Sequence, residues 1–279
     1  MRLRKSYKIY QTFSKDILSQ RRKYKRVVVK VGSSLFATDK NQLDMVLARK
    51  IARQISELVK QGKEVVVVSS GAIALGMSIL KLTQRPEKLE YLQAAAAIGQ
   101  HELMHVYKLA LNKYRLNCAQ LLLTWDDFLG VRYENAKQTL NTLLKLKCVP
   151  IINENDSVAT EEIKLGDNDR LSALVSILVG ADLLIILSDV EGLLDKNKKV
   201  IRQVNKITGE IKSLACPINK KTCVGGMVTK LEAARIAIEG GVPCVIANGR
   251  KAKIISQLTN NPFCQGTIFL PYCEDKDSR

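Results

Sequence analysis

The sequence predicts an α/β protein, a three-layer α/β/α sandwich around a mostly parallel sheet. Short apolar runs, many of them β-branched, alternate with longer stretches of helical periodicity, which is typical of βαβ units with both sheet faces covered. Of the 279 residues, 46% are hydrophobic but only 5% are aromatic, so aliphatic side chains must build the core. This length allows one large domain or two smaller ones.

Strands are predicted where short apolar runs are bounded by polar or turn-forming residues. In chain order they are Val27–Val31, Val65–Ser69, Ala119–Leu123, Cys148–Ile152, Leu183–Leu187, Val242–Ile246 and Thr267–Leu270. Glycine adopts the backbone conformations of tight turns, and it occurs where strands are expected to end, at Gly32, Gly71, Gly192 and Gly249.

Helices are predicted between these strands, where apolar residues recur at helical spacing. In chain order they cover about Leu43–Lys60, the segment after Ser69, the Ala-rich stretch Leu92–Leu111, a region near Asn135–Leu146, Leu171–Val179 and Met227–Glu239. The region Lys196–Cys223 is more polar and less periodic, so we expect a hairpin or lid there.

Basic residues are concentrated at the amino-terminal end. Residues 1–26 contain ten Lys or Arg and the single acid Asp16, and so carry +9 of the net charge of +17. We therefore predict a basic extension over 1–25, one domain over 26–273 and a tail over 274–279. A solvated arm is favoured over a nucleic-acid-binding segment, a membrane-binding segment or a mitochondrial presequence.

The seven cysteines are odd in number and include no C-x-x-C pair, which argues against a disulfide framework or a zinc ribbon. We expect free thiols in a reducing compartment, the cytoplasm. No apolar run approaches the roughly 18 residues of a membrane span, and no signal-peptide pattern is present, so we expect no membrane partner.

Carboxylates and amides are concentrated in Asn153–Asp169, between an expected strand and an expected helix. An irregular connection at the carboxyl end of a strand is the usual ligand edge of an open α/β sheet. Lys30 lies at the tip of the first strand and precedes Gly32, while Val224–Lys230 places two glycines before a helix and a lysine one turn into it. Each element alone is compatible with a solvated lysine or a simple turn, but together they predict an anion site.

His101-Glu102-Leu103-Met104-His105 matches the zinc motif H-E-x-x-H. These are the only two histidines in the chain, and a third ligand would have to be a downstream carboxylate such as Glu134. A chance match on an ordinary helix is favoured, and a zinc hydrolase is kept as a remote alternative.

Several motifs resemble those of glutamate 5-kinases, in the amino acid kinase superfamily, from about Arg26 to Leu270. In order they are Val-Lys30-Val-Gly32-Ser, Ser69-Ser70-Gly71-Ala72, Ala-Ala-Ile-Gly99-Gln100, Gln120-Leu-Leu-Leu-Thr124, Ile-Asn153-Glu-Asn-Asp156, Gly166-Asp-Asn-Asp169, Ser188-Asp189 and Gly225-Gly-Met-Val-Thr-Lys230. The resemblance implies the amino acid kinase fold and ATP-dependent phosphorylation of the L-glutamate side-chain carboxylate to L-glutamyl 5-phosphate, the first step of proline biosynthesis. A related kinase with another acceptor is the main alternative.

The resemblance also implies roles for individual residues. Lys30 and Lys230 would hold the transferring phosphoryl group, oriented by Asp169. The substrate-binding positions would be Ser70, Asp156 and Asn168, with Asn153 and Asp167 shaping the pocket. The nucleotide-binding positions would be Lys30, Gly32, Ser188, Asp189, Val224, Gly225, Gly226, Met227, Val228, Thr229 and Lys230. Magnesium would be held by the ATP phosphates.

Three further expectations come from the resemblance. We expect a homo-oligomer, proline as a feedback inhibitor that competes at the glutamate loop, and a short form without the C-terminal PUA domain of many relatives. Val224, Val228 and Leu194 replace the Thr, Ser and aromatic residue usual in the family, so the nucleotide contacts are expected to differ.

Overall fold

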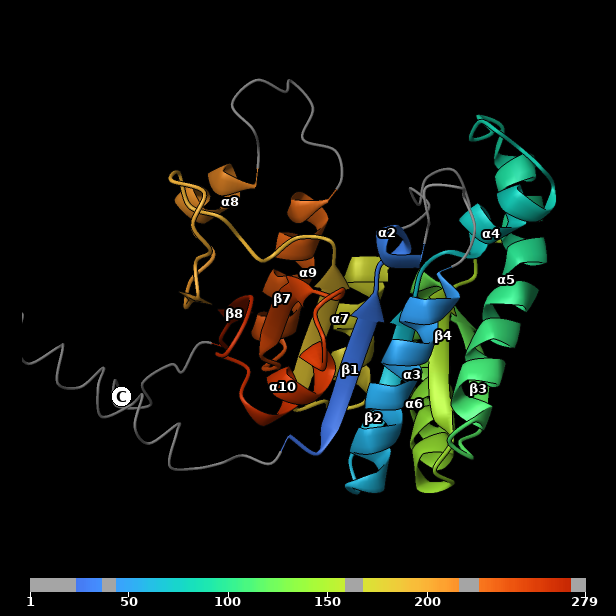
Figure 1. The fold of residues 1–279 in the computed structure, drawn as a ribbon, viewed down its shortest axis with the longest axis horizontal. Coiled ribbons are helices and arrows are strands. Elements are labelled where there is room, and N and C mark those ends of the chain that lie inside the picture. The colour runs from blue at the N-terminus through green and yellow to red at the C-terminus, as the bar shows by residue number, and fades with distance from the viewer. Residues whose placement is uncertain (1–23, 37–43, 159–167, 216–225, 272–279) are drawn as a thin grey trace, which may run out of the picture.

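A computed structural model describes residues 24–36, 44–158, 168–215 and 226–271, which form a sheet of eight strands with helices on both faces (Figure 1). The strand order is β3-β4-β2-β1-β5-β7-β8-β6. Every strand pairing in this described part of the chain is parallel except β7–β8. The predicted α/β class with a mostly parallel sheet is confirmed.

All the predicted strands are present, with ends shifted by at most two residues. The strands are β1 (Arg26–Val31), β2 (Glu64–Ser69), β3 (Cys118–Leu123), β4 (Val149–Glu154), β5 (Leu183–Ser188), β6 (Gln203–Val204), β7 (Cys244–Asn248) and β8 (Thr267–Phe269). The helices are α2 (Ser33–Phe36), α3 (Met45–Lys60), α4 (Ala72–Ile79), α5 (Leu89–Asn112), the 3-10 helix η1 (Trp125–Phe128), α6 (Gly130–Lys145), α7 (Asn168–Leu178), α8 (Gly209–Leu214), α9 (Met227–Glu239) and α10 (Ile254–Asn260).

Two local predictions need correction. Asn153–Asp169 is not irregular at its ends, because β4 stays paired with β3 as far as Glu154 and α7 already begins at Asn168. The polar region Lys196–Cys223 begins within a short antiparallel turn that pairs Leu194 with Val200, as a hairpin does, but its described part also contributes β6 and the short helix α8. The described part of this region ends at residue 215.

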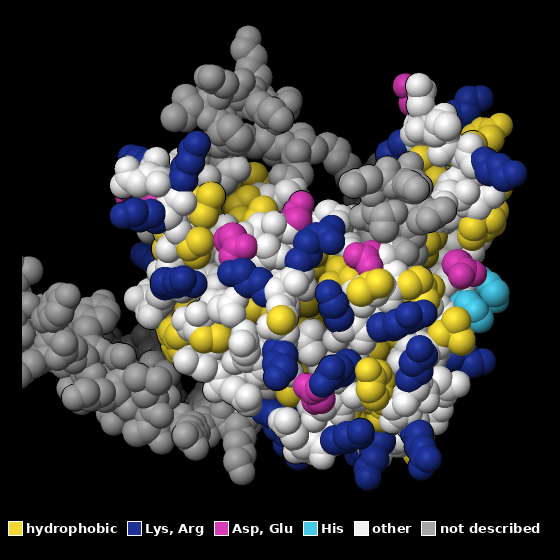
Figure 2. Space-filling model, viewed as in Figure 1, with side chains coloured by type: hydrophobic (Ala, Val, Ile, Leu, Met, Phe, Trp, Pro, Cys, Tyr) yellow, Lys and Arg dark blue, Asp and Glu magenta, His cyan; other side chains and the backbone are white. Residues whose placement is uncertain are grey.

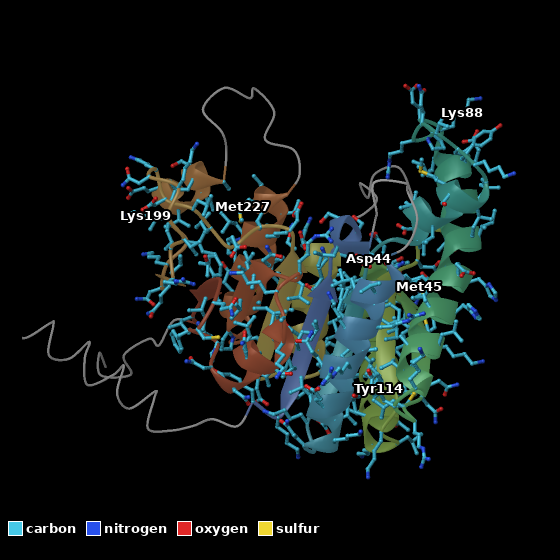
Figure 3. All side chains as sticks on the ribbon, in the orientation of Figure 1. Asp44, Met45, Lys88, Tyr114, Lys199 and Met227 are labelled. Carbon is cyan, nitrogen blue, oxygen red and sulfur yellow. The ribbon has the colours of Figure 1, made fainter. Side chains whose placement is uncertain are left out.

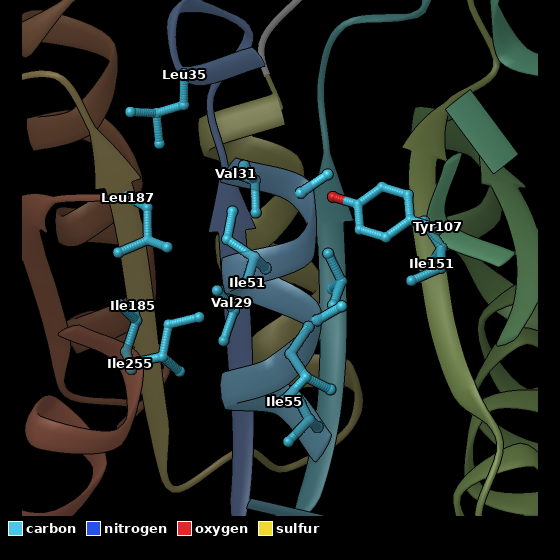
Figure 4. Close-up of a cluster of buried hydrophobic side chains, with 14 of the residues drawn as sticks. Val29, Val31, Leu35, Ile51, Ile55, Tyr107, Ile151, Ile185, Leu187 and Ile255 are labelled. Atoms are coloured by element: carbon cyan, nitrogen blue, oxygen red, sulfur yellow. The ribbon is translucent and has the colours of Figure 1, made fainter. Parts of the chain in front are cut away.

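The valines of β1 alternate between the two faces of the sheet. Val29 and Val31 pack with side chains of α3, α5 and α10, as the close-up in Figure 4 shows for Ile51, Tyr107 and Ile255. The side chain of Val28 packs on the opposite face, with side chains of α6, α7 and α9. This face lies behind the sheet in the view of Figure 1. By the same alternation Lys30 projects toward the face that carries α7 and α9.

Helices α4 and α5 pack so closely that only glycine fits at two crossing points. A Cβ atom on Gly99 of α5 would lie 1.8 Å from the Ala72 carbonyl oxygen, and one on Gly76 of α4 would lie 1.8 Å from the Ala95 carbonyl oxygen. The 24-residue helix α5 begins just after Lys88, at the upper end of the molecule in Figure 3, and ends just before Tyr114 at the lower end. Within the described residues, no helix combines the length and apolarity needed to cross a membrane.

Replacing Gly99 with Ala is expected to lower the free energy of unfolding by about 1–3 kcal/mol, the usual cost of adding a methyl group to a packed core. The upper part of that range is expected because the new Cβ overlaps backbone atoms, which cannot rotate away. Urea denaturation measures the change. Gly209→Ala is the matched control, since its Cβ meets nothing within 4 Å; equal effects of the two substitutions would contradict the prediction.

Candidate active site

Polar residues collect where β1, β2, β4 and β5 end, at one edge of the sheet. These strands are parallel neighbours, so their carboxyl ends lie together at the upper edge of the sheet in Figure 1. Strand β1 pairs with β2 on one side and with β5 on the other. From β1 the chain first adds strands on the β2 side of the sheet and later, from β5, on the other side. The point where the strand order reverses in this way is the usual ligand site of an open α/β sheet.

Three predicted residues meet at this edge as one buried charged group. Lys30 Nζ lies 2.6 Å from Asp169 Oδ1, and Lys230 Nζ lies 3.3 Å from Asp169 Oδ2. The Thr229 hydroxyl donates a hydrogen bond of 2.7 Å to Asp169 Oδ2. The exposed fractions of Lys30, Asp169 and Lys230 are 5%, 4% and 8%. Three distant segments of the sequence, β1, α7 and α9, are thus joined by one carboxylate.

The charge balance of this group favours an anion. Burial acts to raise the pKa of Asp169, but the charges of Lys30 and Lys230, with hydrogen bonds from Lys30 and Thr229, lower the pKa below its ordinary value. The carboxylate is therefore ionised at neutral pH and balances only one of the two lysines. The surplus positive charge lies in a poorly hydrated setting, where it attracts a phosphate strongly.

Gly226 fixes the place of Lys230. Its φ of +74° lies in a region that favours glycine, and its carbonyl oxygen accepts a hydrogen bond from Lys230 Nζ at 3.0 Å. The same carbonyl oxygen lies 3.2 Å from Thr229 Oγ1, whose proton is donated over the shorter distance to Asp169. Helix α9 then begins at Met227, toward the upper end of the molecule in Figure 3, and continues through the half-buried Val228. Val224 and Gly225 lie outside the described residues.

Side-chain amides form a network beside the lysine group. Asn168 Nδ2 donates to Ser70 Oγ at 3.0 Å and to Asn153 Oδ1 at 2.8 Å. Asn153 Nδ2 in turn donates to Gln100 Oε1 at 2.9 Å. Ser70, Asn153 and Asn168 were predicted as site residues from the sequence, but Gln100 was not, because its only signal was its place in a family motif. Asp167 lies outside the described residues.

Next to this network is a cavity of about 350 Å³ that Ala72, Ala96, Gln100, Asn153 and Asp156 help to line. The Asp156 side chain is 7% exposed, and its Oδ1 atom has no hydrogen-bond partner among the described residues. Burial, followed by repulsion from Glu154, raises the pKa of Asp156 to about 7, and Arg85 offsets part of this shift. A buried carboxylate with an unpaired oxygen is suited to a cationic ligand group.

The remaining predicted nucleotide residues lie at the ends of β1 and β5. The Gly32 N–H donates to the Leu187 carbonyl oxygen at 3.2 Å, and a Cβ on Gly32 would lie 3.3 Å from that oxygen. Ser188 ends β5 beside Asn248 of β7, and its hydroxyl donates to Asp189 Oδ1 at 2.9 Å. These residues lie at the same carboxyl edge as Lys30.

The two histidines of the zinc motif lie exposed on α5, where they form the cyan patch of Figure 2. His101 also lines the cavity next to Gln100. Within the described residues, no group of three or more His, Cys, Asp or Glu side chains is placed to hold a metal ion. The motif therefore lacks a third protein ligand in this part of the chain.

Comparison with known proteins shows the family of this chain. The sequence pattern of the amino acid kinase family matches residues 25–248. The chain is 45% identical to a glutamate 5-kinase of Caldanaerobacter subterraneus over 91% of its length and 70% of that protein. It is 44% identical to a glutamate 5-kinase of Clostridium acetobutylicum over 88% of its length and 94% of that protein. It is 47% identical to a glutamate 5-kinase of Paraburkholderia phymatum over 85% of its length and 65% of that protein. The chain therefore belongs to the amino acid kinase family and, within it, to the glutamate 5-kinases.

Proposed function

We propose that this chain transfers the γ-phosphoryl group of ATP to the side-chain carboxylate of L-glutamate and so forms L-glutamyl 5-phosphate, the first step of proline biosynthesis. The observation that carries the proposal is the buried Lys30–Asp169–Lys230 group, which has a surplus positive charge at the ligand edge of the sheet. Asn168, adjacent to Asp169, joins this group to a cavity suited to an amino acid. The names of the relatives support glutamate as the acceptor.

The reaction needs alignment and charge neutralisation rather than a general base. A glutamate side chain has a pKa of about 4.3, so its carboxylate is already ionised at neutral pH. One carboxylate oxygen attacks the γ-phosphorus, and the bond from that phosphorus to the bridging oxygen of ADP breaks. Lys30 and Lys230 offset the repulsion between the two anions, and Asp169 holds both ammonium groups in place.

The other residues divide between the two substrates. Asp156 would pair with the α-ammonium group of glutamate, and Ser70, Asn168 and Asn153 would direct the amino acid toward the lysines. The nucleotide would lie along Gly32, Ser188 and Asp189, and along Gly226, Met227, Val228, Thr229 and Lys230 at the start of α9.

Magnesium would reach the site on the ATP phosphates, where it neutralises phosphate charge. The Asp169 carboxylate supports this placement, because it already pairs with Lys30, Lys230 and Thr229 and so does not serve as a magnesium ligand. Inhibition by proline, which shares an amine and a carboxylate with glutamate, is proposed at the Asp156 cavity. Assembly into a homo-oligomer stays a prediction from the family. The cytoplasm also stays a prediction. Among the described residues, Cys118, Cys148, Cys244 and Cys264 are free thiols.

A coupled assay of ADP release tests the proposal with L-glutamate, N-acetyl-L-glutamate, L-aspartate and UMP as acceptors. Activity is expected only with L-glutamate. ADP release with another acceptor and not with glutamate would favour the alternative of a related kinase. The native chain is expected to keep its activity in a zinc chelator, and His101→Ala is expected to retain this activity. An activity that needs zinc and disappears in His101→Ala would revive the hydrolase alternative.

A further inference from the structure

Of the two polar atoms in the Gln100 side-chain amide, one has a hydrogen-bond partner among the described residues and the other has none. Its Oε1 atom accepts the hydrogen bond from Asn153 Nδ2, but its Nε2 atom has no acceptor among the described residues. The residue is only 8% exposed, and it forms part of the cavity wall. Because a buried donor without a partner destabilises a fold, an unpaired N–H at a cavity wall is placed to donate to whatever fills the cavity, water in the free protein or a ligand atom in a complex.

Other groups that line the same cavity indicate which kind of ligand atom would suit Nε2. Ala72, which also lines the cavity, is the first residue of α4, and α4 has no side-chain cap at this end. The free backbone N–H groups of a first helical turn favour a negative charge. Asp156 contributes an unpaired carboxylate oxygen to the same cavity. One cavity therefore offers donors for an anionic group and an acceptor for a cationic one.

We infer that Gln100 is a further substrate-binding residue, whose Nε2 donates a hydrogen bond to the α-carboxylate of the amino acid substrate. An α-amino acid carries an ammonium and a carboxylate on one carbon, which matches the pairing of Asp156 with Gln100. This inference rests on the proposed function. Through Oε1, Gln100 also holds Asn153, which accepts the hydrogen bond from Asn168, the neighbour of Asp169. Gln100 thereby links recognition of the α-carboxylate to the place of phosphoryl transfer.

L-isoglutamine is the probe for this contact, because it keeps the reacting side-chain carboxylate and the ammonium but has a neutral amide in place of the α-carboxylate. The native chain is expected to prefer L-glutamate in kcat/KM by about 100-fold or more, since a site built for a charged hydrogen-bonding group rejects its neutral analogue. Equal kcat/KM values for the two compounds in the native chain would overturn the inference without any variant.

Gln100→Glu reverses the preference of the contact while keeping the shape of the side chain. It retains an oxygen to accept from Asn153, but it replaces the donor with an oxygen that repels the α-carboxylate and accepts from an α-amide. KM for L-glutamate is expected to rise about 10- to 100-fold, and KM for L-isoglutamine is expected to rise much less. Effects on Asp156 or on the fold act on both compounds alike, so the ratio of their kcat/KM values isolates the contact.

Gln100→Met is the companion variant, with similar length but neither amide atom. It should raise KM for both compounds by releasing Asn153, and it should also reduce the preference for L-glutamate. If both variants change the two compounds by one common factor, Gln100 has only a structural role and the inference fails. If the native chain releases no ADP with L-glutamate, the proposed function fails, and this result is distinct from the loss of preference alone.

Discussion

Replacing Asp169 with Asn is expected to lower kcat by about 100- to 1000-fold, the usual cost of removing one preorganised electrostatic group from an active site. A neutral amide cannot hold Lys30 and Lys230 at 2.6 and 3.3 Å, so the two ammonium groups would move apart and lose their alignment on the transferring phosphoryl group. The coupled ADP assay at saturating glutamate and ATP measures the change.

The same substitution should also destabilise the unliganded protein, by about 3–5 kcal/mol, because it leaves buried charges without a partner. The lowered pKa of Asp169 means that its stabilising effect is present at neutral pH and is lost only as the pH falls through the folded-state pKa, below the ordinary carboxylate range. ATP phosphates would restore a counter-charge to the lysines. The rise in Tm on adding ATP with magnesium should therefore be larger in Asp169→Asn than in the native chain.

Thr229→Val is the matched control for this prediction. It keeps the side-chain shape but removes the hydroxyl that lies 2.7 Å from Asp169 Oδ2 and 3.2 Å from the Gly226 carbonyl oxygen, so a loss of only about 3- to 10-fold in kcat is expected. A kcat in Asp169→Asn that is no lower than in Thr229→Val would show that Asp169 does not organise the two lysines.

Local patterns in the sequence mark Lys30 and Lys230 as candidate anion-binding residues, but the link from Asp169 to both lysines was predicted only from the family resemblance. Lys30 ends a run of valines, Asp169 precedes a periodic apolar stretch, and Lys230 follows a pair of glycines. The contact between them follows from the topology, since parallel strands and the helices after them bring these segments to one edge. Their 2.6 and 3.3 Å distances come from the structure alone.

Gln100 and the short elements could not be predicted in the same way. Gln100 lies in an Ala-rich helix, and it reaches the cavity only because Gly76 and Gly99 let α4 and α5 touch. That crossing joins residues distant in sequence and leaves no local periodic signal. Strand β6 has two residues and exists through its pairing with β8, and the six-residue helix α8 is too short to show a hydrophobic repeat.

Asp156→Asn is expected to raise KM for L-glutamate by about 100-fold, because the substrate ammonium loses a buried carboxylate partner. The effect on stability should have the opposite sign. A carboxyl group whose pKa is about 7 in the folded chain and 3.8 in the unfolded chain binds more protons when folded, so the native chain loses stability as pH rises between these values. At pH 8 the variant should be more stable by about 2–4 kcal/mol, and this gain should shrink as pH falls toward 4.

A rise in KM together with a rise in stability at pH 8 distinguishes a ligand-binding carboxylate from a structural one. If Asp156 held the fold together, Asp156→Asn would lower Tm at pH 8 and leave KM almost unchanged, which is the outcome that would contradict the assignment. Thermal unfolding at pH 5 and pH 8, combined with glutamate titrations, measures both quantities.

The pH dependence of KM provides a second test, with Glu154 as its control. Only ionised Asp156 pairs with the substrate ammonium, so KM for L-glutamate in the native chain should fall as pH rises through about 7 and then level off. Repulsion from Glu154 contributes to the raised pKa of Asp156, so Glu154→Gln should move this fall in KM to lower pH. In Asp156→Asn the fall should disappear. A native KM that stays constant between pH 6 and pH 8 would mean that the substrate ammonium does not pair with Asp156.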